Sequence, residues 1–498
     1  MLAKTSLSFV NEVQTKHVFQ IVAVAFVAYN ALWLIYTLFI SSLRKIPGPF
    51  LARISWLWET KKVATGNIHE IIMDLHKRHS ELAVAGHRHP KLMLIQSSLG
   101  PIIRVGPNRY DFDTMEAVKT IYRIGNALPK SDYYIPFGLP SFPTLFDVRD
   151  PGHHAIMKKQ VAALYTMTAL LSYESGVNGQ TIILKEQLQK FCDQKEVINL
   201  PQFLQYYAFD VIGAITVGES MGMMESNSDT NGACADLDSL WHYASMMALT
   251  PSLHGWWILI SAILPVPVAI KGLTEYIQRR ISEYRKNAAE LGDKVALKDE
   301  GNFLAKLLLM KKEGKATPVD TRQAVGLNIG AGSDTTANAL SSILYYIFQD
   351  AQGIPYLQAV IKETLRLHPG VGTQLTRVVP KGGLVIEGQF FPGGIEVGVN
   401  GWALYHNKAI FGDDASSFRP ERWLEANENL NISGTFAFGA GSRSCIGKNI
   451  SILEMSKAIP QIVQNYDVEI NHGDKTWKNE CWWFVKPEYK ALIKPRAA

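Results

Sequence analysis

The stretch FAFGAGSRSCIGKNI, residues 436–450, surrounds one cysteine with glycines and an arginine and leads directly into an apolar, helix-forming segment. Arg443 shortly precedes Cys445, and we expect a helix to begin at the residue after the cysteine. A thiolate is favoured where a cation and helix N-terminal N–H groups converge. Gly441 and Gly447 lack side chains where a flat ligand would approach the backbone closely. The pattern therefore predicts that Cys445 is a thiolate ligand.

One sulfur beneath a large planar ligand is the arrangement of haem-thiolate iron. The alternative is a buried structural cysteine in a glycine-rich turn, which does not explain why five residue types, Phe438 among them, stand at fixed offsets. The segment from Phe438 to Gly447 resembles the haem-binding signature of the cytochrome P-450 family. This resemblance implies a mainly α fold with small β-sheets, in which haem b lies between a long central helix and the cysteine loop.

The composition is that of a globular protein with an apolar bias. The chain has 498 residues, of which 47% are hydrophobic and 19% charged, and its net charge is +5. Its four cysteines show neither CxxC spacing nor a Cys/His cluster, which argues against a zinc site or a disulfide framework and fits a reducing compartment. Basic runs with interleaved aromatic residues are absent from the sequence, so we expect no nucleic-acid partner.

An uncharged stretch, residues 18–40, is expected to cross a membrane as one helix. As a helix it would span about 34 Å, enough for a hydrocarbon core. A cleaved signal peptide would have a shorter apolar region. Positive charge is denser after the stretch, which places the bulk of the protein in the cytosol at the endoplasmic reticulum membrane. The expected organisation is a lumenal N-terminus (1–17), an anchor (18–40), a Pro/Gly hinge (41–50) and a catalytic domain (51–498).

A long helix is predicted from Pro318 to about Gln349, with the small and polar segment IGAGSDTTAN in its middle. Thr335 can direct its hydroxyl to the carbonyl of Ala331 and open a local bulge, while Asp334 can relay protons from solvent. A close helix crossing that needs small residues is the alternative, and it explains the glycines but not the Asp–Thr pair. The segment resembles the family signature Ala/Gly-Gly-x-Asp/Glu-Thr. The resemblance implies that Asp334 and Thr335 deliver protons to dioxygen and that Ala331 lies at the haem.

Three further residues are assigned to structure rather than chemistry. Glu363 and Arg366 lie at i and i+3 on one helix face, and Arg422 follows in the stretch FRPERW. An ordinary surface ion pair would explain an isolated pair of this spacing. The resemblance to the family implies instead that these three side chains form a buried charge network behind the haem.

The resemblance also implies contacts to the haem propionates and to the substrate. Arg377, at the start of a probable strand, is expected to reach one propionate. The segment around His154 and Lys158 falls where a second propionate-contacting helix belongs, but the usual Trp/Arg pattern is absent. Substrate contacts are expected around Tyr133–Phe146, Leu200–Pro265, Asn328, Ala331 and Val371–Leu375.

The interval between Thr335 and Glu363 is short for this family, whose members usually place an extra helix and a loop there. Here the sequence FQDAQGIPYL joins the two helices almost directly, so the shortened part lies between Tyr346 and Tyr356. Either the enzyme has lost that helix or the sequence carries a missed exon. The lost helix would pack outside the haem pocket, which leaves the residues assigned to chemistry in place.

The resemblance implies a monooxygenase that inserts one oxygen atom of O2 into an apolar small molecule. A membrane-anchored member would take its electrons from an NADPH-dependent cytochrome reductase, with cytochrome b5 as a second candidate partner. Stretches such as RVGPNRYDF and FGDDASSFRPERW look most like fungal pisatin-demethylase-like monooxygenases. This likeness favours an oxidation in secondary-metabolite biosynthesis.

Two other interpretations stay open. A haem-thiolate isomerase, dehydratase or peroxygenase would need no reductase, but such enzymes can dispense with proton delivery to dioxygen, and both Asp334 and Thr335 are present. A haem-binding pseudoenzyme or a truncated gene model is supported only by the shortened interval.

Overall fold

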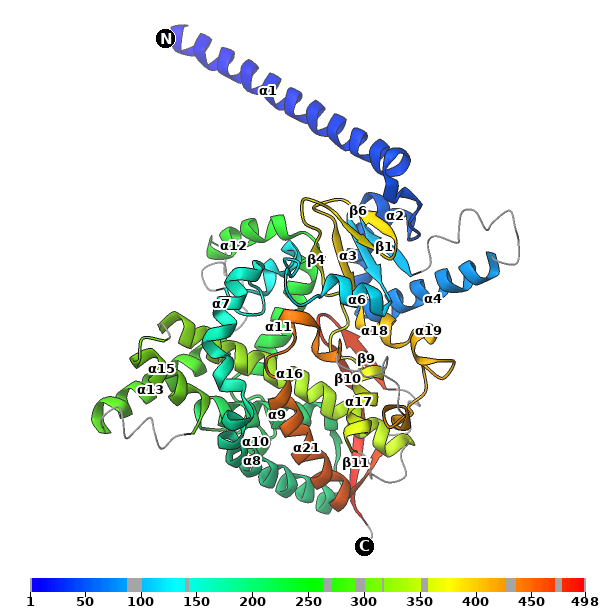
Figure 1. The fold of residues 1–498 in the computed structure, drawn as a ribbon. Coiled ribbons are helices and arrows are strands. Elements are labelled where there is room, and N and C mark those ends of the chain that lie inside the picture. The colour runs from blue at the N-terminus through cyan, green and yellow to red at the C-terminus, as the bar shows by residue number, and fades with distance from the viewer. Residues whose placement is uncertain are drawn as a thin grey trace.

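The computed structural model of the chain describes residues 2–86, 101–138, 143–263, 271–291, 301–315, 318–350, 357–425, 436–470 and 477–496. Figure 1 shows one long helix projecting from a body in which helices predominate, with the strands β1 and β6 near the base of that helix. The predicted mainly α fold with small β-sheets is confirmed.

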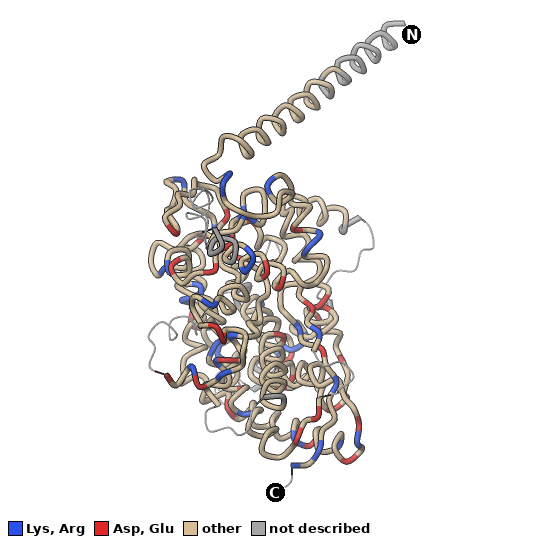
Figure 2. The backbone as a smooth tube through the Cα atoms, turned by 90° about the vertical axis from the view of Figure 1, so that its right-hand side faces the viewer, with Lys and Arg blue, Asp and Glu red and all other residues tan. Residues whose placement is uncertain are grey.

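The N-terminal helix α1 (Leu2–Ile35) continues into a π-helical turn, Tyr36–Ile40. The segment Gln20–Ile40 has a mean hydropathy of 2.0 with 6% of its window buried, and by length and composition it can cross a membrane. Figure 2 shows no charged residue along its described part.

The expected hinge lies against the body. Leu43, in the short helix Ser42–Lys45, and Ile46, directly after it, are buried at 2% and 1% exposure. The carbonyl of Pro47 accepts a hydrogen bond of 2.7 Å from the N–H of Arg104. The residues that follow the apolar helix are therefore packed on the body of the protein.

Helices form most of the body. The first half of the chain contributes α2 (Phe50–Ile54), α3 (Leu57–Val63), α4 (Ile68–Gly86), α6 (Met115–Ile121), η3 (Asp132–Phe137), α7 (Pro151–Val161), η4 (Ala162–Tyr165), α8 (Met167–Gln194), α9 (Leu200–Val217), α10 (Met223–Ser226) and α11 (Ala233–Met247). The second half contributes η5 (Pro251–Leu253), α12 (His254–Ile263), α13 (Lys271–Leu291), α15 (Phe303–Lys312), α16 (Pro318–Asp350), α17 (Leu357–Leu367), α18 (Gly401–Tyr405), α19 (Lys408–Phe411), η6 (Pro420–Trp423), η7 (Phe436–Phe438), η8 (Gly441–Arg443) and α21 (Lys448–Asn465).

The described strands form four small sheets. One sheet has the order β1 (Ile102–Gly106), β2 (Arg109–Phe112), β7 (Glu396–Val399), β4 (Arg377–Val378), in which β2 and β7 are parallel. A second sheet has the order β3 (Val197–Asn199), β11 (Lys490–Pro495), β8 (Tyr466–Ile470). Two hairpins complete the set, β5 (Leu384–Ile386) with β6 (Gln389–Phe391) and β9 (Lys478–Cys481) with β10 (Val485–Glu488). Arg377 begins β4, as expected.

The long helix α16 runs through the centre of the body and packs along α9. A Cβ atom added at Gly332 would lie 2.9 Å from Cδ1 of Ile212 on α9. The close-crossing interpretation therefore accounts for this glycine. Pro318 and Asp350 bound α16, close to the predicted limits.

Two local expectations were wrong. The segment around Thr335 is regular α-helix, so the predicted bulge is not present. The helix after Cys445 begins at Lys448 rather than at Ile446, because the intervening backbone turns first. Most of the expected shortened segment, residues 351–356, lies outside the described residues.

Candidate active site

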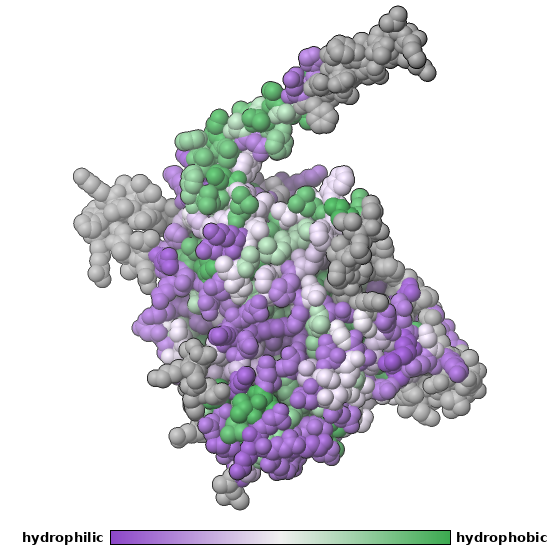
Figure 3. Space-filling model, turned by 180° about the vertical axis from the view of Figure 1, so that it is seen from behind, coloured by the Kyte–Doolittle hydropathy of each residue, from purple (hydrophilic) through white to green (hydrophobic). Residues whose placement is uncertain are grey.

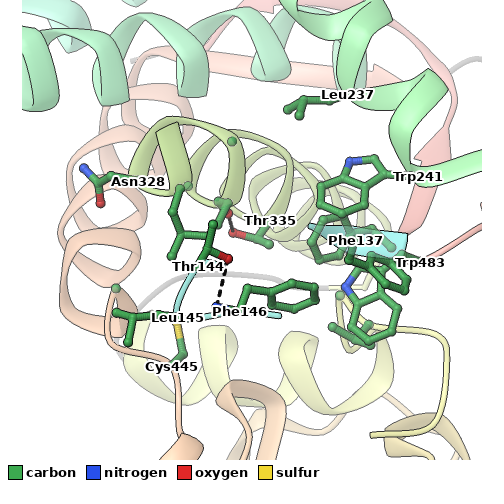
Figure 4. A pocket seen from close by; sticks show the side chains of 18 of the residues that line it. Phe137, Thr144, Leu145, Phe146, Leu237, Trp241, Asn328, Thr335, Cys445 and Trp483 are labelled. Carbon is green, nitrogen blue, oxygen red and sulfur yellow. Dashed lines mark hydrogen bonds between the residues drawn. The ribbon is translucent and has the colours of Figure 1, made fainter. Parts of the chain in front are cut away.

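A cavity of about 910 Å³ opens in the middle of the body, within the size range of small-molecule and cofactor sites. Figure 4 shows Cys445, from the loop before α21, and Thr335, from α16, directed into it from different elements. Seven of the nine residues predicted to serve the chemistry or hold the cofactor line this cavity: Ala331, Thr335, Arg377, Phe438, Arg443, Cys445 and Gly447.

Cys445 presents its open surface to the cavity, while the rest of the residue is enclosed by protein. Its N–H donates to the carbonyl of Phe438 at 2.7 Å, which fixes the loop. Burial raises the pKa of the Cys445 thiol, and the N–H groups of Gly447 and Lys448 and the charges of Lys158 and Lys448 act to lower it. The sulfur thus has donors and cations that support a thiolate once a metal ion offsets the burial.

Arg443 has backbone partners that the sequence did not indicate. Its guanidinium donates to the carbonyls of Val148 at 2.6 Å and Arg149 at 2.9 Å. It therefore ties the cysteine loop to the segment before α7, while Lys158 and Lys448 are cations that lower the pKa of the Cys445 thiol.

Gly441 also has a different task from the one expected. It does not line the cavity; its φ is +66° and an added Cβ would lie 1.8 Å from the carbonyl oxygen of Tyr122. Glycine is required because the loop turns and packs on the backbone there. Gly447 lines the cavity as expected, and an added Cβ would lie 4.0 Å from the sulfur of Cys445.

Basic side chains meet at one wall of the cavity: Lys130, His154, Lys158, Arg377 and Arg443. Burial lowers the pKa of Lys130, and the nearby guanidinium groups of Arg377 and Arg443 lower it further. Burial beside the same cations lowers the pKa of His154 to about 3, and burial lowers that of Arg443 to about 10. Mutual repulsion of this kind is relieved when an anion binds among the groups.

The two residues of the acid–alcohol pair on α16, Asp334 and Thr335, point in different directions. Thr335 lines the cavity, and its hydroxyl donates to the carbonyl of Ala331 at 2.8 Å, as predicted. Asp334 is fully buried and points away from the cavity. Its oxygens accept hydrogen bonds from Nε2 of Gln205 at 2.6 Å and from Nε1 of Trp241 at 2.8 Å.

An aromatic wall encloses the side of the cavity next to Thr335 (Figure 4). The ring centroids of Phe137 and Trp483 are 4.8 Å apart, and those of Phe146 and Trp483 are 5.5 Å apart. Trp241 extends the wall, with its ring 6.3 Å from that of Phe137. Edge-to-face rings of this kind form a rigid apolar surface that suits a flat ligand.

The assigned structural residues meet in a buried network. Oε1 of Glu363 accepts hydrogen bonds from Arg366 at 2.8 Å and from Arg422 at 2.9 Å. The sequence did not indicate two further donors to the same carboxylate: the N–H of Arg419 and Nε1 of Trp423, each at 2.9 Å. Glu363, Arg366 and Arg422 are at most 1% exposed, so these hydrogen bonds replace the water that the buried carboxylate has lost.

A sequence model described as Cytochrome P-450 matches residues 63–350 and 346–495. The chain belongs to the cytochrome P-450 family. Cytochromes P-450 hold haem through a thiolate and use dioxygen, and this chain is a member of the monooxygenase class.

Named fungal relatives are similar to this cytochrome P-450 over most of its length. Two proteins of Fusarium vanettenii named pisatin demethylase are each 70% identical to it, covering 100% of the chain and 98% or 100% of the relative. A cytochrome P-450 monooxygenase of Emericella nidulans is 31% identical over 89% of the chain and 92% of the relative.

The shortened interval coincides with a break in the match. The family model aligns in two parts that meet at residues 346–350, at the end of α16. The alignment with one pisatin demethylase spans 524 positions against the 498 residues of this chain, so that relative carries residues that face gaps here. Both observations agree with a segment missing after Tyr346.

The cavity residues fit haem b. A planar macrocycle with two propionate carboxylates needs one axial donor, a flat space and cations at one edge. Cys445 offers the donor, Gly447 leaves space beside the sulfur, and the basic wall offers the cations. The sequence did not indicate Lys130, because no recognisable motif surrounds it. Its Nζ donates a hydrogen bond to the carbonyl of Phe146.

Proposed function

We propose that this cytochrome P-450 binds haem b through Cys445 and oxidises a flat, apolar aromatic molecule in fungal secondary-metabolite biosynthesis. Electrons come from NADPH through a membrane-bound reductase, with cytochrome b5 as an accessory donor. The observation that carries the proposal is the placement of Cys445 and Thr335 on one cavity that also has an aromatic wall.

The substrate is pisatin or a close relative of it, and the reaction removes a methyl group. The proposal rests on the 70% identity to two pisatin demethylases and on the aromatic wall, which suits a planar molecule. Oxidation of a methyl group bound to a heteroatom gives a hydroxymethyl group that leaves as formaldehyde. One atom of O2 enters the product and the other leaves as water, with two electrons and two protons supplied from outside.

The chain's own residues position the substrate and supply protons. Bound haem supplies the oxygen-activating chemistry. Phe137, Phe146 and Trp483 exclude water and orient a methyl group toward the centre of the cavity. The hydroxyl of Thr335 can turn from the carbonyl of Ala331 into the cavity and pass on a proton there. Asp334, on the other side of α16, then gives the Thr335 hydroxyl a new proton, which it receives from the protein surface.

The test combines spectra and products. The reduced protein with carbon monoxide should show the thiolate-type Soret band, and NADPH with a reductase should convert pisatin into its demethylated product and formaldehyde. Product formation with hydrogen peroxide alone, and none with NADPH and reductase, would favour the peroxygenase interpretation. Absence of the thiolate-type band in the wild type would contradict the enzyme assignment.

Replacing Thr335 with alanine should uncouple electron use from oxidation. A positioned acid–base group contributes roughly 10²–10⁴-fold to a reaction step. We therefore expect product per NADPH to fall at least about tenfold, with the missing electrons recovered as hydrogen peroxide. Thr336→Ala is the matched control, because Thr336 also lines the cavity but its hydroxyl bonds Ser451 at 3.1 Å. Equal coupling in Thr335→Ala and the wild type would remove Thr335 from this role.

The proposed association with the membrane rests on two apolar surfaces at one end of the molecule. The apolar helix Gln20–Ile40 anchors the protein in the endoplasmic reticulum membrane, and the basic residues that follow it keep the body in the cytosol. Hydrophobic surface continues from this helix onto the adjoining body (Figure 3). Helix α12 lies at the same end (Figure 1) and exposes Trp256 at 67% and Leu259 at 59%.

This geometry predicts residual membrane binding without the anchor. Deleting residues 1–40 should leave the protein associated with lipid vesicles, because α12 buries aromatic and aliphatic side chains in the interface. Adding Trp256→Asp and Leu259→Asp should release it in a flotation assay. The control variant Leu171→Asp, on α8 and 69% exposed, should not release it. Full release by the deletion alone would contradict a second contact.

A further inference from the structure

Trp241 joins two parts of the proposed machinery that are otherwise separate. Its ring lines the cavity and packs against Phe137 and, at 4.9 Å between centroids, against Phe484. Its indole N–H points the other way and donates to Oδ2 of Asp334 at 2.8 Å. One side chain, seen at the cavity in Figure 4, therefore contacts both the space that a substrate would occupy and the buried carboxylate of Asp334.

The same carboxylate has a polar connection to the surface. Nζ of Lys486, on β10, lies 3.5 Å from Oδ2 of Asp334, and it also pairs with Asp238 on α11. The side chains of Lys486 and Asp238 are 29% and 47% exposed, whereas Asp334 is fully buried. Protons can thus reach Asp334 from solvent through this pair, with the thiol of Cys234 as a further titratable neighbour.

Two hydrogen-bond donors, Gln205 and Trp241, and one cation, Lys486, hold the carboxylate of Asp334 turned away from the cavity. The carboxylate cannot turn toward Thr335 while all three interactions persist. Of these three residues, Trp241 is the one that lines the cavity. A ligand that pushes on its ring would weaken the bond to Oδ2 without disturbing the connection to the surface.

We propose that Trp241 is a positioning residue that couples filling of the cavity to proton delivery by Asp334. The proposal rests on the proposed function. With the cavity free of substrate, the indole N–H keeps the carboxylate in place. When an aromatic substrate presses on the ring, Oδ2 is released, and a proton passes from Lys486 and Asp238 through Asp334 to the hydroxyl of Thr335. Dioxygen is then supplied with protons only when a substrate is present to be oxidised.

The test compares Trp241→Phe with Trp482→Phe in the full-length, haem-loaded protein. Both variants keep an aromatic ring at the position that is changed. Trp482 is the matched control because its Nε1 also donates to a carboxylate oxygen, Oε1 of Glu480 at 2.9 Å, whereas Trp482 does not line the cavity. In Trp241→Phe the product formed from pisatin per NADPH should fall about tenfold, at the lower end of what a hydrogen bond to a charged group contributes. Peroxide should rise correspondingly, and Trp482→Phe should remain coupled.

A second readout does not depend on turnover. The ultraviolet resonance Raman difference between the wild type and Trp241→Phe isolates the indole N–H band of Trp241. Filling the cavity with phenylimidazole, an aromatic ligand of haem iron, should shift this band toward weaker hydrogen bonding. An unshifted band, or equal uncoupling in the two variants, would overturn the proposal.

The two proposals fail in different ways. If the wild type demethylates no pisatin yet the Raman band shifts with phenylimidazole, the substrate assignment is wrong and the coupling stands. If the wild type demethylates pisatin and Trp241→Phe does so with the same coupling, the role of Trp241 is wrong and the proposed function stands.

Discussion

Replacing Cys445 with alanine is expected to abolish the thiolate-type Soret band and all NADPH-dependent oxidation. The sulfur is the donor atom that the loop Phe438–Gly447 presents to the cavity, with backbone N–H groups and two lysines arranged around it. Alanine leaves no axial donor at this position. Activity should therefore fall to the background of the reductase alone, measured as formaldehyde released per NADPH.

Cys192→Ala serves as the matched control for this experiment. Cys192 lies on α8 and is 8% exposed, so its loss removes a buried sulfur without touching the cavity. It should keep the spectrum and the activity. Cys445→Ser separates loss of sulfur from loss of side-chain volume, and its spectrum should lack the thiolate-type band as well. A normal carbon monoxide spectrum in Cys445→Ala would show that another residue is the axial ligand.

The parts of the site that the sequence predicted are those with short-range patterns. The cysteine loop is defined by offsets within ten residues or so, and α16 by its proline start and its length. Glu363 and Arg366 lie one helical turn apart, so their shared face follows from the helix period. These features depend on local geometry, and the structure places Thr335, Cys445 and the Glu363 network as the spacing indicated.

The remaining parts depend on contacts between distant segments. Gln205 and Lys486 meet at Asp334 from α9 and from the C-terminal hairpin, and Trp241 comes from α11. No periodicity or spacing relates these positions along the chain. Gly441 was assigned to the cofactor because a glycine in a turn does not reveal which backbone it packs against; the structure identifies Tyr122.

Removing one arginine from the Glu363 network is expected to destabilise the protein more than any other substitution proposed for the scaffold. Arg422→Leu deletes the donor at 2.9 Å to Oε1 and leaves the fully buried carboxylate of Glu363 with Arg366 as its remaining guanidinium partner. Breaking a buried ion pair by removing one side typically costs roughly 3–5 kcal/mol, and the bonds from Arg366 place the expected cost at the lower end of this range. The midpoint of urea unfolding, followed by the loss of the thiolate-type spectrum, should fall accordingly.

Arg422→Lys tests whether charge alone is sufficient. Arginine here also reaches the carbonyls of Phe411 and Asp414, which a single ammonium group cannot bond together with Glu363. We therefore expect Arg422→Lys to be intermediate between the wild type and Arg422→Leu. Lys494→Ala removes a partly exposed ion pair to Glu469 and should cost at most about 1 kcal/mol. If Arg422→Leu were as mild as Lys494→Ala, the guanidinium of Arg366 with the neutral donors of Trp423 and Arg419 would suffice to hold the Glu363 carboxylate, and Arg422 would not be needed for its stability.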